Sequence, residues 1–128
     1  MSQRIDVINY LHELLSGIVP ETHYLKNKKK TVIYPYQTFS LTGEPTRFMG
    51  QGFYIDVDIF DNNTTSDVPI EKALSAMAEK FNQAEPFYEM TDKFLAQIEY
   101  RNDNPIPTGS DTLQRRTIQL YAKIDWRI

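Results

Sequence analysis

Residues 112–128 read TLQRRTIQLYAKIDWRI, and this stretch decides the fold. From Ile118 onward every second residue is apolar. The apolar set is Ile118, Leu120, Ala122, Ile124, Trp126 and Ile128. Because successive side chains of a strand point to opposite faces of a sheet, the alternation predicts a strand with one buried and one wetter face. At about 3.3 Å per residue, an unbroken strand of this length could extend roughly 50 Å.

Three further segments carry strand signals. Residues 53–60 and 93–101 alternate between apolar and polar side chains, and residues 31–41 are rich in β-branched and aromatic side chains. Pro35 interrupts the last of these and predicts an edge or a bulge there, because proline has no N–H for the sheet ladder. Residues 86–90 could add a short extended piece.

Two segments carry helix signals. Apolar residues recur every three or four positions after Ser2 and again after Asp67, which is the spacing of one helix face. The first helix should end near Ser16 and Gly17, where glycine can adopt the left-handed capping conformation. The second helix should begin at Asp67 or the following valine and end before Pro86.

The predicted order of elements is therefore α-β-β-α-β-β. This order is typical of an α+β fold in which both helices cover one face of an antiparallel, or mixed, sheet of about four strands. The hairpins should have long loops, residues 42–52 and 102–111, because Gly and Pro in both segments oppose regular structure. The length of 128 residues predicts a single domain, residues 1–128.

The composition excludes several kinds of chemistry. The chain has no cysteine, which removes disulfides, thiolate nucleophiles and cysteine-based zinc sites. The formal net charge of -3 argues against a dedicated nucleic-acid binder, which is usually basic. No apolar run approaches the roughly 20 residues of a membrane helix, and the N-terminus leads into an amphipathic helix rather than a signal peptide. We therefore expect a cytoplasmic protein without a membrane partner.

A basic run, made of Lys26, Lys28, Lys29 and Lys30, ends the connection formed by residues 18–30. One interpretation is a solvated loop that leads into a strand. The other is a surface that meets an acidic partner or a nucleic-acid backbone. The run is too short to specify a partner, and it gives no reason to expect sequence-specific nucleic-acid binding.

Asp56 and Asp58 are the strongest candidates for chemistry. They lie two residues apart on one predicted strand, so both side chains point to the same face, roughly 7 Å apart. Such a pair could hold a hard cation or act as acid and base. The alternative is a wet strand face, on which the two carboxylates pair with Lys123, Arg127 or Arg101.

Other catalytic patterns are missing from the sequence. The two histidines, His12 and His23, stand far apart without an acid at ligand spacing, whereas a zinc site needs at least three close ligands. The chain has no glycine-rich phosphate-binding loop and no Gly-x-Ser-x-Gly motif. The sequence therefore predicts no catalytic residue, no metal site and no cofactor.

The residues best suited to contacts lie on the loop tips and on the sheet face turned away from the helices. Phe48 and Met49, with Arg47 beside them, occupy a Gly-rich tip that either folds back over the core or inserts into a neighbouring molecule. The predicted contact residues are Arg47, Phe48, Met49, Tyr54, Asp56, Asp58, Asn104, Ile106, Tyr121 and Lys123.

The whole layout resembles a known family. An N-terminal helix, a strand of the kind seen at residues 54–60, a helix around residues 73–81 and a final strand of the kind seen at residues 120–126 resemble the tail terminator proteins of tailed phages. These are also called tail-completion or tail-to-head joining proteins. The resemblance covers nearly the whole chain and rests on its size, the order of its elements and the residue pattern of its strands.

The resemblance implies a structural protein of a phage or prophage, and not an enzyme. Its subunits would form a ring, typically a hexamer, that caps the tail tube and then joins the tail to the head connector. The implied partners are further copies of the chain, the tail tube protein and the head-closure or connector protein. The implied location is the head–tail interface of the virion, after assembly in the bacterial cytoplasm.

Two alternatives stay open at this stage. The first is another head–tail connector protein or a minor capsid protein, which would share the same setting. The second belongs to a different class, a small α+β enzyme or ligand-binding protein with a pocket between helices and sheet. That alternative needs convergent polar groups inside an apolar cavity.

Overall fold

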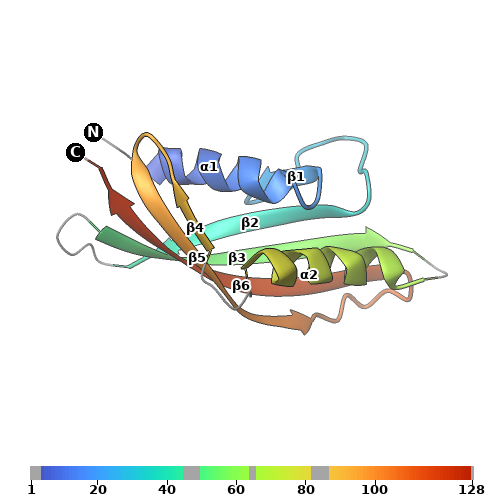
Figure 1. Cartoon of the computed structure of the whole chain (residues 1–128). Coiled ribbons are helices and arrows are strands. Elements are labelled where there is room, and N and C mark those ends of the chain that lie inside the picture. The colour runs from blue at the N-terminus through green and yellow to red at the C-terminus, as the bar shows by residue number, and fades with distance from the viewer. Residues whose placement is uncertain (1–3, 45–49, 64–65, 82–86, 128) are drawn as a thin grey trace.

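The computed structural model describes residues 4–44, 50–63, 66–81 and 87–127 of the chain. Two helices and six strands follow one another along it (Figure 1). They are α1 (Arg4–Ser16), β1 (Glu21–Tyr24), β2 (Tyr36–Gly43), β3 (Gly50–Asn62), α2 (Val68–Phe81), β4 (Phe87–Met90), β5 (Phe94–Pro105) and β6 (Leu113–Trp126).

All six strands belong to one sheet, in the spatial order β1-β2-β3-β6-β5-β4. The pair β1 and β2 is parallel, and every other neighbouring pair is antiparallel, so the sheet is mixed. The long strands β3 and β6 lie at its centre and pair from Gly50 opposite Asp125 to Asn62 opposite Leu113. The sheet curls into a half-barrel (Figure 1).

The central strands bury one face and expose the other, as their alternation predicts. On β3 the buried side chains are Phe53, Ile55, Val57 and Ile59, and on β6 they are Ile118, Leu120, Ala122 and Ile124. Each of these eight side chains is fully buried. Trp126 is only half-buried at the edge of the core, and Ile128 lies outside the described residues.

Both helices pack against this same buried face (Figure 1). The inward sides of the two helices are apolar at helical spacing, and α1 contributes Val7, Leu11 and Leu15. From α2 come Ile70, Leu74, Met77 and Phe81. Because helices and strands share one apolar cluster, the opposite face of the sheet is left without a cover from the described chain.

The predicted four-strand α-β-β-α-β-β fold is wrong. The described chain forms six strands, in the element order α-β-β-β-α-β-β-β, and strands make up 49% of the described residues. The two additional strands are β1 and β4, each only four residues long, at the two edges of the sheet. Strand β4 lies within the short extended piece predicted for residues 86–90. Strand β1 lies where the sequence predicts a connection, since a strand of four residues is too short to show an alternation pattern.

The long hairpins differ from their predicted limits. The strand predicted for residues 31–41 begins only at Tyr36, after Pro35, and runs to Gly43. It pairs antiparallel with β3, which supports the predicted hairpin, although the loop tip with Arg47, Phe48 and Met49 lies outside the described residues. The predicted loop of residues 102–111 is shorter than expected, because β5 continues to Pro105.

Candidate interaction face

The sheet face turned away from the helices is the main candidate for function, and we call it the outer face. It is formed by the side chains that alternate with the buried ones on β2, β3, β6 and β5. Its members include Tyr36, Thr38, Ser40, Tyr54, Asp56, Asp58, Phe60, Arg115, Thr117, Gln119, Tyr121, Lys123, Gln97 and Glu99. All are half-buried or exposed, and the face mixes aromatic with charged side chains.

One cluster on the outer face joins three strands. The rings of Tyr36 and Phe60 stack with centroids 4.8 Å apart and planes 15° apart. The Arg115 guanidinium lies 5.5 Å from the centre of the Phe60 ring, a cation–π arrangement. Arg115 also donates from Nε to Asp58 Oδ1 at 3.1 Å. Stacking, cation–π contact and ion pair together hold these side chains in one arrangement, so the surface is preorganised.

A second cluster lies further along β3 and β6. The rings of Tyr54 and Tyr121 meet edge to face at 5.0 Å, and the Arg101 guanidinium lies 5.5 Å from the centre of the Tyr121 ring. The Tyr121 hydroxyl donates to Glu44 Oε2 at 2.9 Å. Partial burial, followed by the hydrogen bond to Glu44, raises the pKa of Tyr121, so this hydroxyl stays protonated at neutral pH.

Asp56 and Asp58 are held by separate partners. Asp56 accepts from Gln119 Nε2 at 3.4 Å, whereas Asp58 pairs with Arg115. The partners differ from the three basic residues we had predicted. Within the described chain no group of three or more acidic or histidine side chains could hold a metal ion.

The histidines also lie apart from the two aspartates. The His12 ring contacts the backbone carbonyl of Thr22 at 2.9 Å, and His23 lies 3.5 Å from Glu21 at the edge of the sheet. Neither α1 nor α2, the helices of the described chain, has the length and apolar content that crossing a membrane requires.

The structure brings several of the predicted contact residues together. Tyr54 and Tyr121 touch, and Asp58 shares a sheet row with Asn104, because both lie opposite Thr117. Lys123 is exposed nearer the other end of β6, and Ile106 is half-buried after the end of β5. Arg47, Phe48 and Met49 lie outside the described residues.

The predicted contact residues do not include Tyr36, Phe60 and Arg115, although the three side chains form one cluster on the face. Alternation along β3 is enough to place Phe60 on the outer face. Its stacking on Tyr36 and its contact with Arg115 follow from the strand register, in which Phe60 lies opposite both residues.

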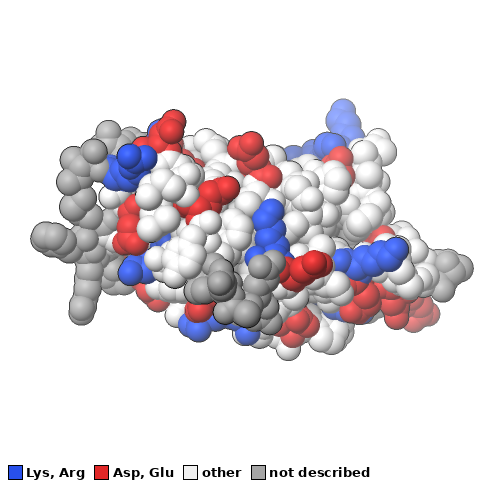
Figure 2. Space-filling view, viewed as in Figure 1, with Lys and Arg blue, Asp and Glu red and all other residues white. Residues whose placement is uncertain are grey.

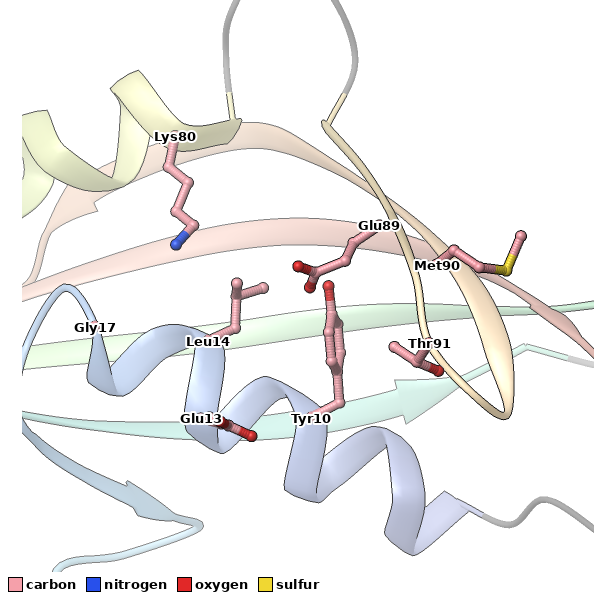
Figure 3. A pocket seen from close by; sticks show the side chains of 8 residues that line it. All are labelled: Tyr10, Glu13, Leu14, Gly17, Lys80, Glu89, Met90 and Thr91. Atoms are coloured by element: carbon pink, nitrogen blue, oxygen red, sulfur yellow. The ribbon is translucent and has the colours of Figure 1, made fainter.

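A second candidate is a hollow of about 430 Å³ between α1, the end of α2 and β4 (Figure 3). Figure 3 shows the Tyr10 hydroxyl turned toward the Glu89 carboxylate, with Lys80 reaching in from α2. Burial, followed by the influence of Glu89, raises the pKa of Tyr10. Polar side chains therefore converge on this hollow, as the enzyme alternative requires, and none of the described residues that line it is a histidine.

A substitution at Gly52 tests how firmly the second cluster is packed. A Cβ at this position would overlap the Tyr121 hydroxyl and approach Glu44 Oε2. Gly52→Ala should therefore displace Tyr121 and lower the free energy of unfolding by about 1–3 kcal/mol in urea denaturation. Gly17→Ala is the matched control, because its nearest heavy atom would lie 3.4 Å away. Equal stability changes in the two variants would show that Tyr121 moves aside without cost.

No protein-family model and no curated protein matches this sequence. Among solved structures, the fold is similar to that of a chain in the virion of a native gene transfer agent particle. That match has a TM-score of 0.61 and 8% identity, and it covers 88% of this chain and 84% of the other. A second solved protein, whose name states no function, matches with a TM-score of 0.72 and 10% identity over 99% of both chains. At these identities the likeness shows a shared fold.

Proposed function

We propose that this chain is a structural protein of a phage or prophage and forms the tail terminator ring. The observation that carries the proposal is the fold shared over most of the chain with a component of a gene transfer agent virion. The resemblance of the sequence to tail terminators supports the same conclusion. The chain then acts by contact, with no catalytic step and no cofactor.

The outer face supports a contact function in physical terms. Aromatic and arginine side chains dominate the energy of many protein interfaces. Here they are held rigid by stacking and ion pairs before any partner binds, which lowers the entropy cost of association. Since the helices cover only the other face, a tube or connector subunit can reach this one.

In the proposed assembly the subunits form a ring, typically a hexamer, at the head-proximal end of the tail tube. The ring contacts the tube protein on one side and the head connector on the other, and it assembles in the bacterial cytoplasm. A ring of identical subunits uses head-to-tail contacts between two different patches of each subunit.

Addition of the purified chain to polymerising tail tube protein tests this function. If the chain caps the tube, electron micrographs should show tubes that stop growing and carry a ring at one end. A variant that carries Val68→Ala, a change on an exposed side chain of α2, serves as a folded control that should also cap. Tubes that grow to the same lengths with and without the chain would contradict the proposal.

A second candidate is another head–tail connector protein or a minor capsid protein. It is favoured by the same observation, because the matching chain is described only as part of a virion. The gene order separates the two candidates. A tail terminator gene should lie just before the gene of the major tail protein.

The enzyme alternative makes a different prediction about the two outer-face aspartates. If they perform chemistry, Asp56→Asn together with Asp58→Asn should abolish an activity. If the chain is structural, the double variant should fold almost normally, because the ion pair of Asp58 with Arg115 is partly exposed and contributes about 0–1 kcal/mol. Capping should then weaken but persist, because both side chains lie on the proposed contact face. Tube capping by the double variant, compared with the unchanged chain at equal concentration, measures the difference.

A further inference from the structure

Most of the exposed large hydrophobic side chains of the described chain lie at the two edges of the sheet. Six of its eight exposed large hydrophobic side chains lie at these edges, and the other two are Ile5 and Val68 on the helices. Leu25, Val32, Ile33 and Tyr34 follow β1 in the connection to β2, and Tyr88 and Met90 lie on β4. The strand order places β1 and β4 at opposite ends of the sheet.

The patch beside β1 is basic. We define the β1 patch as Leu25, Val32 and Ile33 together with Lys26, Lys28 and Lys30. All six side chains are exposed, and the three lysines form no ion pair with any residue that the structure describes. Lys and Arg side chains are visible near the β1–β2 connection at the upper right of Figure 2.

The β1 patch is fixed to the sheet. The amide of Leu25, a residue with a φ of 70°, donates to the Phe39 carbonyl at 2.9 Å. Lys29 pairs with Glu21 at 2.8 Å, and the ring of Tyr34 lies 5.6 Å from that of Tyr36. These contacts hold both ends of the connection, so the apolar and basic side chains are presented in a defined place.

The patch on β4 carries two acidic side chains. We define the β4 patch as Tyr88 and Met90 together with Glu89 and Asp92. The Glu89 carboxylate turns toward Tyr10 (Figure 3), and Lys93, beside Asp92, pairs with Asp6. Tyr88 and Met90 are 56% and 59% exposed, values that are high for side chains in a strand. Asp and Glu side chains lie around the β4–β5 hairpin in Figure 2, together with Lys or Arg side chains. Next to Tyr88 lies a hollow of about 200 Å³, lined also by Glu99, Tyr121 and Lys123, that an aliphatic side chain of a partner could enter.

From this arrangement we infer that the β1 patch of one copy docks on the β4 patch of the next. The inference rests on the proposed ring function and names the surfaces that close the ring. Each patch combines apolar anchors with charge of one sign, and the signs are opposite. Two copies of the same patch would repel each other, so the charges favour a head-to-tail contact over a two-fold symmetric one. The positions at opposite edges allow one subunit to bind two neighbours at once.

Two variants, each with one altered patch, test the inference. One carries Lys26→Glu, Lys28→Glu and Lys30→Glu, and the other carries Tyr88→Ser and Met90→Ser. Each should raise the dissociation constant of the oligomer by at least about tenfold in sedimentation velocity, because the anchors and the charge match are lost. Val68→Ser, at a side chain that is 54% exposed away from both edges, is the matched control and should leave assembly unchanged.

A mixture of the two variants gives a sharper result. Each variant keeps one intact patch, so the mixture should form a dimer that cannot grow, whereas either variant alone stays monomeric. Circular dichroism melts confirm that both variants fold. Where the unchanged chain forms oligomers in solution, oligomers of normal size in either variant, or no dimer in the mixture, would overturn the inference.

Cross-linking in assembled particles covers the case in which the ring forms only on the tail tube. The chain has no cysteine, so Ile33→Cys combined with Met90→Cys introduces one thiol in each patch. A short bis-maleimide should then link neighbouring copies into a ladder of covalent oligomers. Ile33→Cys combined with Val68→Cys is the control and should give no ladder.

The outcomes separate this inference from the proposed function. Normal tail termination without a ladder would overturn the inference and leave the terminator function standing. A ladder of cross-linked copies, together with tails of normal length in particles that lack this chain, would support the inference and contradict the terminator function. A chain that neither self-associates nor enters particles would contradict both.

Discussion

Leu120→Ala should lower the free energy of unfolding by about 2–5 kcal/mol, because it leaves a cavity at the centre of the core. Leu120 is fully buried on β6 and lies opposite Ile55 of β3, in the pairing of the two longest strands. Apolar residues from both helices share the same core. Urea denaturation measures the change as a lower transition midpoint.

Leu25→Ala is the matched control for this experiment. It makes the same chemical change at a side chain that is 60% exposed. Its effect on the free energy of unfolding should stay within about 0.5 kcal/mol. If the two variants lost equal stability, the central strands would not form the core described here.

Gln37→Leu should also lower the free energy of unfolding, and its local effect should be largest in β1. The Gln37 side chain is fully buried, and its Nε2 donates to the Leu15 carbonyl at 3.0 Å and to Thr22 Oγ1 at 2.8 Å. Thr22 in turn donates to the Val19 carbonyl at 2.6 Å. This chain of hydrogen bonds ties the end of α1 and strand β1 to β2.

Replacing Gln37 by leucine removes two buried hydrogen bonds, although the Leu15 carbonyl keeps the amides of Ile18 and Val19 as donors. The loss of the two bonds should cost about 1–3 kcal/mol of stability. Hydrogen exchange should accelerate most in β1, because that edge strand pairs with β2 alone. Gln97→Leu, on the outer face of β5, is the control and should leave exchange in β1 unchanged. Uniform acceleration across the sheet would contradict the local role of Gln37.

The long strands could be predicted because apolar and polar side chains alternate along their sequences. Ile55 and Leu120 each belong to a run that alternates over many residues, and that period fixes both strand type and buried face. Strand β1 has no such run. It is held by its parallel pairing with β2 and by the Thr22–Gln37 hydrogen bond, and both join residues that are distant in sequence.

The outer face was likewise predictable only in part from the sequence. Alternation alone placed Tyr54, Asp56 and Tyr121 on one face of the sheet. The stack of Tyr36 on Phe60 depends on the register between β2 and β3, which a single sequence does not specify. The edge patches also depend on topology, because only the strand order puts the basic and acidic segments at opposite ends.

The measurement that tests the central claim most directly is the tail length distribution after deletion of the gene for this chain. If the chain forms the terminator ring, electron micrographs of the phage or prophage that encodes it should show overlong tails without heads. Supplying the unchanged chain from a plasmid should restore tails of uniform length joined to heads. Tails of normal length attached to heads in the deletion strain would contradict the account.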